Sequence, residues 1–219
     1  MGLISLQKIV LVGAGGHSKI LIDIIKHSYE IVGMTDVDQA KHGGKFYGVD
    51  VLGNDDLLID IYSKGIRNAL VSIGSVGSCS LREKVCAYVK AIGFDMVNAI
   101  SKNTIISDSV AMGYGNAIMD CAIIHADTTI GNNVIINTGS VIEHDCIIED
   151  FVHIAPRAVI SGGVFIGRGT HIGVGASVIQ GISIEKNCII GSGAVVVRDI
   201  PDNSLCVGVP AKIIKQLKE

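Results

Sequence analysis

The chain has 219 residues, a formal charge of −3 and 18% charged residues, and its mean hydropathy is +0.50. In globular proteins about a quarter of the residues are usually charged. With fewer charges than that, this chain must bury much of its surface or pair it with other chains. The near-neutral charge, without clusters of Lys or Arg, argues against a nucleic-acid-binding protein. No apolar run approaches the roughly 18 residues of a membrane span. No basic segment precedes an apolar run at the N-terminus, so we expect a cytoplasmic protein without a signal peptide.

The first hundred residues indicate a small domain of alternating strands and helices. The sequence "KIVLVGAGGHSKILIDIIKHS" predicts a buried strand, a glycine-rich turn and a helix. A second strand is expected in "EIVGMTD", ending at Asp36, and a third in "ALVSIG" over residues 69–74. A helix near residues 81–91 and a short strand near residues 94–97 follow. This order predicts an α/β domain with a parallel sheet over residues 1–100, similar to half of a Rossmann fold.

The turn "GAGGHS" is close to the dinucleotide fingerprint G-x-G-x-x-G, but Ser18 stands at the third glycine. Asp36 follows about 20 residues on, where a ribose-binding acid belongs. Glycines at a helix N-terminus suit phosphate binding, and the alternative is a tight turn that binds nothing. A complete NAD domain needs two such halves, so a mononucleotide such as a uridine diphosphate fits better than NAD.

A repeat of six residues fills the second half of the chain. Every sixth residue from Ile106 to Val196 is apolar, and thirteen of these sixteen residues are isoleucine. The residue two positions earlier is mostly small or β-branched, and Gly or Asn often closes the hexad, as in "IGNN" and "IGRG". A helix has a period of 3.6 and a simple strand a period of 2, so neither fits. The pattern predicts a parallel β-helix over residues 101–200, with the isoleucines stacked inside it.

The remaining residues, 201–219, contain "GVPAKIIKQLKE", in which Pro210 precedes an apolar-periodic run. We expect a tail with a short helix there. The six cysteines lack the CxxC spacing of zinc or redox sites. We therefore expect reduced thiols, with Cys146 and Cys188 in the core of the repeat.

The hexads resemble the left-handed β-helix of the hexapeptide-repeat acyltransferases, in which three hexads make one triangular coil. With "VGAGGHSK", "TDVD", "VLGND", "NTGSVIEHDC" and "VHIAP", nearly the whole chain resembles the nucleotide-sugar acetyltransferases of the bacillosamine and perosamine type. Their relatives, the sialic-acid O-acetyltransferases, share these features. The resemblance implies that the N-terminal domain holds a UDP- or GDP-linked 4-amino sugar. It also implies that acetyl-CoA lies along the β-helix, between neighbouring subunits of a homotrimer.

Two histidines stand out in "EHDCIIEDFVHIAP". With 18 residues per coil, His144 and His153 lie half a coil apart, so they are expected on different faces and can meet only across a subunit interface. His144 matches the family's catalytic histidine, a general base, and Asp145 matches the acid that raises its basicity. Many members have Glu at that position, so the shorter Asp changes the geometry. His153 matches the histidine that binds the acetyl-CoA thioester and can donate to its carbonyl oxygen. The alternative for both is an ordinary histidine at a corner of the β-helix.

Spacing and resemblance together indicate further ligand-binding residues. The expected acetyl-CoA contacts, besides His153, are Gly173, Val174, Gly191 and Ser192. The expected nucleotide-sugar contacts are Gly15, Gly16, His17, Asp36, Ile73, Gly74 and Asn137. Small residues 18 apart in one column would leave backbone groups open to an extended pantetheine arm, although they also suit ordinary turns.

The favoured function is therefore an acetyl-CoA-dependent N-acetyltransferase that acts on a nucleotide-linked 4-amino-4,6-dideoxy sugar, preferably UDP-linked. Direct attack on the thioester is expected, because no cysteine or serine lies in a nucleophile motif. The alternatives are O-acetylation of sialic acid or another sugar hydroxyl, a non-catalytic scaffold that binds a nucleotide sugar, and an NAD-dependent oxidoreductase. Zinc at the subunit seam, as in the γ-type carbonic anhydrases, is disfavoured because the H-x4-H spacing is absent, so no metal is expected.

Overall fold

The computed structural model describes residues 6–217, and the chain divides into two compact units. One unit runs to Gly74 and includes Ser80–Ala99. The other contains the rest of the chain from Ile100, together with the short segment Ser75–Cys79. That segment leaves the first unit in sequence and packs with the second.

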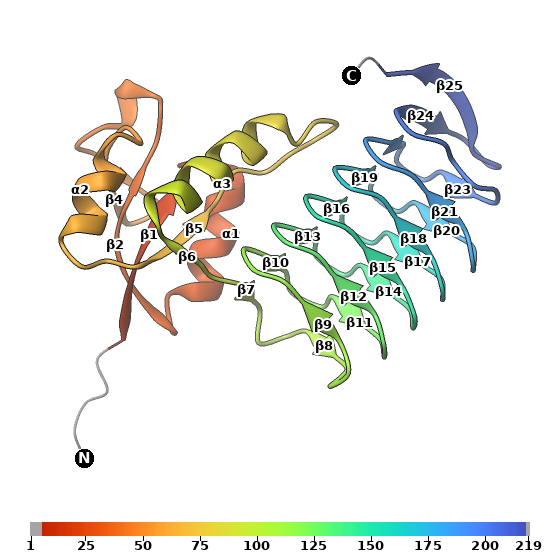
Figure 1. Cartoon of the computed structure of the whole chain (residues 1–219), viewed down its shortest axis with the longest axis horizontal. Helices are drawn as coiled ribbons and strands as arrows, with labels where there is room; N and C mark the ends of the chain where they lie inside the picture. The colour runs from red at the N-terminus through yellow and green to blue at the C-terminus, as the bar shows by residue number, and fades with distance from the viewer. Residues whose placement is uncertain (1–5, 218–219) are drawn as a thin grey trace. The chain divides into compact units, whose positions relative to one another are not determined.

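The first unit is built on a six-stranded sheet of order β3-β4-β2-β1-β5-β6 (Figure 1). Its strands are β1 (Gln7–Val12), β2 (Tyr29–Thr35), β3 (Lys45–Phe46), β4 (Val49–Gly53), β5 (Asn68–Val71) and β6 (Asp95–Met96). Its helices are α1 (Gly16–Ile25), α2 (Leu57–Ser63) and α3 (Ser80–Ile92), with a 3₁₀ turn, η1, at Gln39–Lys41. The sequence predicted the strands β1, β2, β5 and β6 and the helices α1 and α3. The β3–β4 hairpin and α2 were not predicted.

β1 is the central strand of this sheet, and its last four residues are fully buried. It pairs in parallel with β2 on one side and with β5 on the other. The carboxyl ends of parallel strands share one edge of a sheet, which is where α/β domains bind ligands. The turn after β1, Asp36 after β2 and Ser72 after β5 therefore meet at this edge.

The second unit is a parallel β-helix whose short strands stack in successive coils (Figure 1). Its strands are β7 (Ala99–Ile100), β8 (Ile105–Ile106), β9 (Ala111–Met112), β10 (Ala117–Ile118), β11 (Ile123–Ile124), β12 (Thr129–Ile130), β13 (Ile135–Ile136), β14 (Val141–Ile142), β15 (Ile147–Ile148), β16 (His153–Ile154), β17 (Val159–Ile160), β18 (Phe165–Ile166), β19 (His171–Ile172), β20 (Ser177–Val178), β21 (Ser183–Ile184), β22 (Ile189–Ile190), β23 (Val195–Val196), β24 (Ser204–Val207) and β25 (Lys212–Gln216). Each predicted inward position, from Ile106 to Val196, is the second residue of one of the strands β8–β23. The repeat read from the sequence is confirmed.

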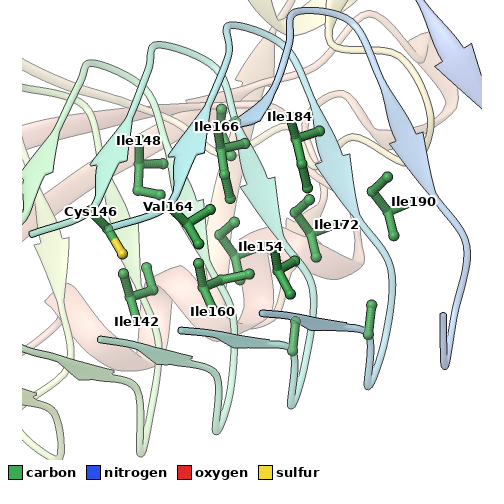
Figure 2. Close-up of a cluster of buried hydrophobic side chains, with 14 of the residues drawn as sticks. Ile142, Cys146, Ile148, Ile154, Ile160, Val164, Ile166, Ile172, Ile184 and Ile190 are labelled. Carbon is green, nitrogen blue, oxygen red and sulfur yellow. The ribbon is translucent and has the colours of Figure 1, made fainter. Parts of the chain in front are cut away.

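Strands pair with the strand 18 residues along the chain, which produces three sheets around one core. Ile136 pairs with Ile154, and Ile154 with Ile172, so identical side chains stack inside the coil. Figure 2 shows Ile154, Ile172 and Ile190 pointing into the interior, together with Cys146 and Val164, which precede Ile148 and Ile166 by two residues. β-branched side chains suit this packing because their χ1 angles are already restricted.

Every sixth residue from Gly115 to Gly193 has a positive φ, so each hexad ends in a left-handed turn residue. Gly, Asn and Asp adopt this conformation most easily, and they hold most of these positions. Asp145 is one of them, with φ 58°. The left-handed backbone conformation at position 145 therefore favours Asp there, independently of any role of its carboxylate.

The expectation of a C-terminal helix is wrong for the described residues. β25 runs antiparallel to β24 and forms the last strand of the sheet that contains β7 and β22. The run "KIIKQ" suits a helix or a strand when taken alone, and the open edge of β24 decides the outcome because its backbone groups need partners.

The described residues contain no helix that is long and apolar enough to cross a membrane. The six cysteines are free thiols, as expected, and Cys146 and Cys188 are fully buried.

We predict that Ile184→Ala lowers the free energy of unfolding by about 2–5 kcal/mol, because Ile184 is fully buried and its truncation leaves a cavity. Ser183→Ala, in the same two-residue strand, should change it by no more than about 0.5 kcal/mol. Denaturant unfolding of both variants checks this. Equal losses would contradict the inward orientation of the repeat.

Candidate active site

A cavity of about 240 Å³ lies at the carboxyl edge of the first unit's sheet. Five of the predicted nucleotide-sugar residues line it, namely Gly15, His17, Asp36, Ile73 and Gly74. Gly16 is the first residue of α1, next to the lining residue Gly15. The seventh predicted residue, Asn137, lies in the β-helix instead.

Ser18 closes the glycine-rich turn from the position of the third fingerprint glycine. Its buried hydroxyl donates to the Gly13 carbonyl (2.7 Å) and accepts from the Gly15 amide (3.0 Å). Gly13 has φ 105°, and a Cβ there would lie 2.8 Å from Ile73 Cγ1, so the turn requires glycine. A Cβ at Gly15 or Gly16 would meet no atom within 4 Å, so these two glycines border open space at the N-terminus of α1. That space suits a phosphate group.

Asp36 is buried and already engaged by the protein. Its Oδ2 accepts from the Ala14 amide (2.6 Å) and from Lys41 Nζ (3.1 Å), and its Oδ1 accepts from the Asp38 amide (2.9 Å). Burial raises the pKa of this carboxyl, but these donors outweigh burial and hold the pKa below its ordinary value. Asp36 thus fixes the glycine-rich turn against β2, whether or not it also contacts a ribose.

His17 is neutral at physiological pH. Burial, followed by the nearby charge of Arg82, lowers its pKa to about 4. Its Cβ lies 3.4 Å from the place that a Cβ on Gly74 would take, so Gly74 leaves room for the imidazole. A neutral imidazole at the cavity wall can donate one hydrogen bond and accept another.

Two polar residues of the cavity were not predicted from the sequence. Asp55 accepts from the buried Thr35 hydroxyl (2.6 Å), and Ser72 donates to the Gly13 carbonyl (2.6 Å). Asp55 belongs to the "VLGND" stretch that carried part of the family resemblance, so that motif was the available signal. Ser72 lay within the predicted third strand but had no distinguishing spacing.

In the second unit, His144 and Asp145 occupy the corner after β14. His144 Nδ1 lies 2.6 Å from Asp145 Oδ2. A carboxylate only accepts, so Nδ1 carries the proton and the lone pair of a neutral His144 is at Nε2. The hydrogen bond to Asp145 raises the pKa of His144 and outweighs desolvation, which lowers it. The charges of Asp145 and Glu143 add smaller increases. The His144 side chain is 63% exposed, so Nε2 can reach a substrate.

His153 begins β16, in a different sheet from β14, as the spacing predicted. Its Nδ1 lies 2.6 Å from the carbonyl oxygen of Ser75, which can only accept. Asn137 Oδ1 accepts from the Thr138 amide (2.8 Å), so Asn137 Nδ2 faces His153 Nε2 at 3.3 Å as a donor. His153 therefore carries its proton on Nδ1, and its Nε2 lone pair accepts from Asn137 Nδ2. With both ring nitrogens paired in this way, the ring keeps no N–H for the expected donation to a thioester carbonyl.

His171 stacks on His153 one coil along, with ring centroids 4.8 Å apart in an edge-to-face arrangement. Its buried Nδ1 has no hydrogen-bond partner among the described residues. Burial lowers the pKa of His171. A neutral His171 beside His153 avoids placing two cations in contact.

The predicted acetyl-CoA contacts at Gly173 and Gly191 differ from expectation, because their backbone amides are already used. The amides of Gly173 and Gly191 donate to the next coil, to Ile190 O (2.8 Å) and Cys206 O (2.7 Å), and are not open to a ligand. A Cβ at Gly173 would lie 2.5 Å from the Ile190 carbonyl oxygen, so coil packing explains that glycine. The amides of Val174 and Ser192 have no acceptor in the described part of the chain, and Val174 is 51% exposed.

No group of three or more His, Cys, Asp or Glu side chains among residues 6–217 has a metal-binding arrangement. The histidine column contributes two stacked rings and no carboxylate. The described residues place a His144–Asp145 pair at a corner of the β-helix and a cavity of about 240 Å³ in the first unit.

The comparisons with known proteins agree with this geometry. The PglD N-terminal domain family matches residues 8–89, and the bacterial transferase hexapeptide family matches residues 127–162. A histidine mutant of perosamine N-acetyltransferase from Caulobacter crescentus, solved with CoA and GDP-perosamine, is 37% identical. The match covers 98% of this chain and 100% of that one, with a TM-score of 0.90. A search of curated proteins gave no match.

Two further structures are similar over almost the whole chain. The acetyltransferase domain of PglB from Neisseria gonorrhoeae is 32% identical, with 95% of this chain and 100% of that chain covered and a TM-score of 0.87. WeeI from Acinetobacter baumannii AYE is 27% identical, with 95% and 100% covered and a TM-score of 0.83.

A β-helix of hexapeptide repeats following a small α/β domain defines a class of acyltransferase. This chain belongs to the family of hexapeptide-repeat acetyltransferases with a PglD-type N-terminal domain, and it is an acetyltransferase. The resemblance read from the sequence is confirmed.

We predict that the pKa of His144 lies above, and that of His171 below, the ordinary value of about 6.5. Asp145→Asn should lower the pKa of His144, because the amide keeps the turn conformation and removes the charge that favours imidazolium. Proton NMR titration of the imidazole Cε1–H signals measures the pKa of His144, the pKa of His171 and the change of the His144 pKa in Asp145→Asn. A His144 pKa that is unchanged in Asp145→Asn would contradict the assigned pairing.

Proposed function

We propose that the protein transfers the acetyl group of acetyl-CoA to the 4-amino group of a nucleotide-linked 4-amino-4,6-dideoxy sugar, with His144 as the general base. The observation that carries this proposal is the exposed His144 imidazole, whose Nδ1 proton is held by Asp145 at 2.6 Å. Acetyl-CoA is the cosubstrate in this family, and a similar N. gonorrhoeae structure is a complex with acetyl coenzyme A.

The reaction needs one proton removed from the attacking amine. His144 Nε2 takes this proton as the amine nitrogen forms a bond to the thioester carbonyl carbon. The C–S bond then breaks, and the proton passes from His144 to the departing thiolate, which leaves as CoA thiol. Asp145 stabilises the intermediate imidazolium, and a base with a pKa near the working pH is efficient for this task.

His153 is proposed to contact acetyl-CoA near the thioester, together with Val174 and Ser192. Its Nδ1 faces the Ser75 carbonyl and its Nε2 faces Asn137 Nδ2, so a hydrogen bond from His153 to the pantetheine arm requires Asn137 to release Nε2. The amides of Val174 and Ser192 supply donors along the same side of the β-helix.

The nucleotide sugar is proposed to bind in the cavity of the first unit. Gly15, Gly16 and the N-terminus of α1 would hold the diphosphate, and His17 would contribute neutral hydrogen bonding. The sequence favoured UDP, whereas the C. crescentus structure holds GDP-perosamine. Both nucleotides therefore belong in the test.

The complete site is proposed to form in a homotrimer, where one subunit's His144 faces the next subunit's His153. The two residues lie on different sheets of one β-helix, so they need two chains to converge. Outward-facing apolar residues support association, since Ile105, Ile147 and Val159 are 62%, 50% and 40% exposed in the single chain.

We predict that CoA thiol is released with a nucleotide-linked 4-amino sugar and not with free sialic acid. GDP-perosamine and a UDP-linked 4-amino sugar are compared as acceptors. His144→Ala should lower kcat by roughly 10²–10⁴-fold, the usual contribution of a general base, and Asp145→Asn should lower it less.

The pH dependence has a definite sign. Activity requires the neutral base, so kcat/KM falls as the pH drops through the raised pKa of His144. Asp145→Asn should move this limb to lower pH. If CoA thiol is released only with sialic acid, the reaction is O-acetylation and not the proposed N-acetylation. If CoA thiol release is retained in His144→Ala, His144 is not the base.

A further inference from the structure

The His144 ring lies over Gly162, the residue one coil further along the same corner. A Cβ at position 162 would lie 2.7 Å from both Cε1 and Nε2 of His144 and 3.2 Å from its Nδ1. Real Cβ atoms are not found at such short distances from other heavy atoms. The imidazole therefore occupies space that any residue with a side chain at position 162 would take.

Backbone geometry does not explain this glycine. Gly162 lacks the positive φ of its neighbour Gly163, whose φ is 67°. The other β-helix glycines without a positive φ differ from it, because a Cβ at each would also meet main-chain atoms, including at Gly113 and Gly191. A Cβ at Gly131, Gly167 or Gly173 would come within 2.7 Å of main-chain atoms of the next coil. At Gly162 the three nearest atoms all belong to one functional side chain.

We propose that Gly162 is a positioning residue for catalysis. Its missing side chain admits the His144 imidazole flat against the corner, in the orientation that pairs Nδ1 with Asp145 and leaves Nε2 for the substrate. The inference rests on the proposed role of His144 as the base.

The expected consequence of a Cβ at this position is specific. His144 is exposed and its side chain can rotate, so Gly162→Ala should displace the ring at little cost to folding. The displacement matters because an error of about 1 Å in the position of a catalytic group can cost about 10²-fold in rate. Moving the ring also disturbs the 2.6 Å contact with Asp145 and hence the raised pKa of His144.

The test compares Gly162→Ala with Gly181→Ala in the full-length protein. Gly181 follows the equivalent corner residue one coil further on, and a Cβ there would meet no atom within 4 Å. Because Gly181 has φ 68°, its alanine variant adds backbone strain that Gly162→Ala lacks, so it shows how much activity a destabilised corner alone removes. Three quantities are measured for each variant: the NMR titration of His144, the thermal midpoint, and kcat and KM for acetyl-CoA with the acceptor that works best in the wild type.

We expect Gly162→Ala to shift the Cε1–H signal and lower the pKa of His144, and to lower kcat by roughly 10–100-fold, while KM for acetyl-CoA changes by less than about threefold. Gly181→Ala should leave the His144 titration as in the wild type. A double-mutant cycle adds a second readout. If Gly162 acts through His144, the His144→Ala/Gly162→Ala variant should have the kcat of His144→Ala alone, whereas an independent structural role would make the losses additive.

Two failures can be told apart. An unchanged His144 titration in Gly162→Ala, or additive losses in the cycle, would overturn this inference and leave the proposed function in place. A displaced His144 ring with unchanged kcat would overturn His144 as the base, and with it the catalytic role of Gly162.

Discussion

The structure of the second unit depends on one constraint, which is that each successive hexad of the inner coils closes with a residue in the left-handed conformation. That residue recurs without interruption from Gly115 to Gly193, so each strand begins at the same point of its coil. The strands 18 residues apart then pair in register, and the isoleucines stack in the interior (Figure 2). A single insertion would turn every later side chain away from its column, including those of the site.

The same constraint builds the proposed active site. Asp145 is a turn residue with φ 58° and also the hydrogen-bond partner of His144, so one position serves folding and the proposed chemistry. Stacking at 18-residue intervals places Gly162 beside the His144 ring and His171 beside His153. The β-helix thus acts as a rigid scaffold, which is what a catalytic constellation requires, because small displacements are costly.

The sequence predicted the β-helix in detail because the fold is encoded by a local repeat, in which each hexad carries the same information. It also predicted that His144 and His153 lie on different sheets, since that follows from counting residues. Features that depend on tertiary context were not predictable. Lys212–Gln216 forms a strand instead of a helix because an edge strand was available to pair with it. Ser75 contributes a backbone carbonyl to His153, and a backbone group leaves no mark in a sequence.

The most direct test of this account is complementation between two inactive variants, His144→Ala and His153→Ala, coexpressed in equal amounts. If each site combines His144 of one subunit with His153 of its neighbour, random trimers should regain about a quarter of wild-type activity, because that fraction of seams has both histidines intact. The singly expressed variants should remain at their own low activities. Activity of the mixture equal to the average of the two variants alone would contradict an active site shared between subunits.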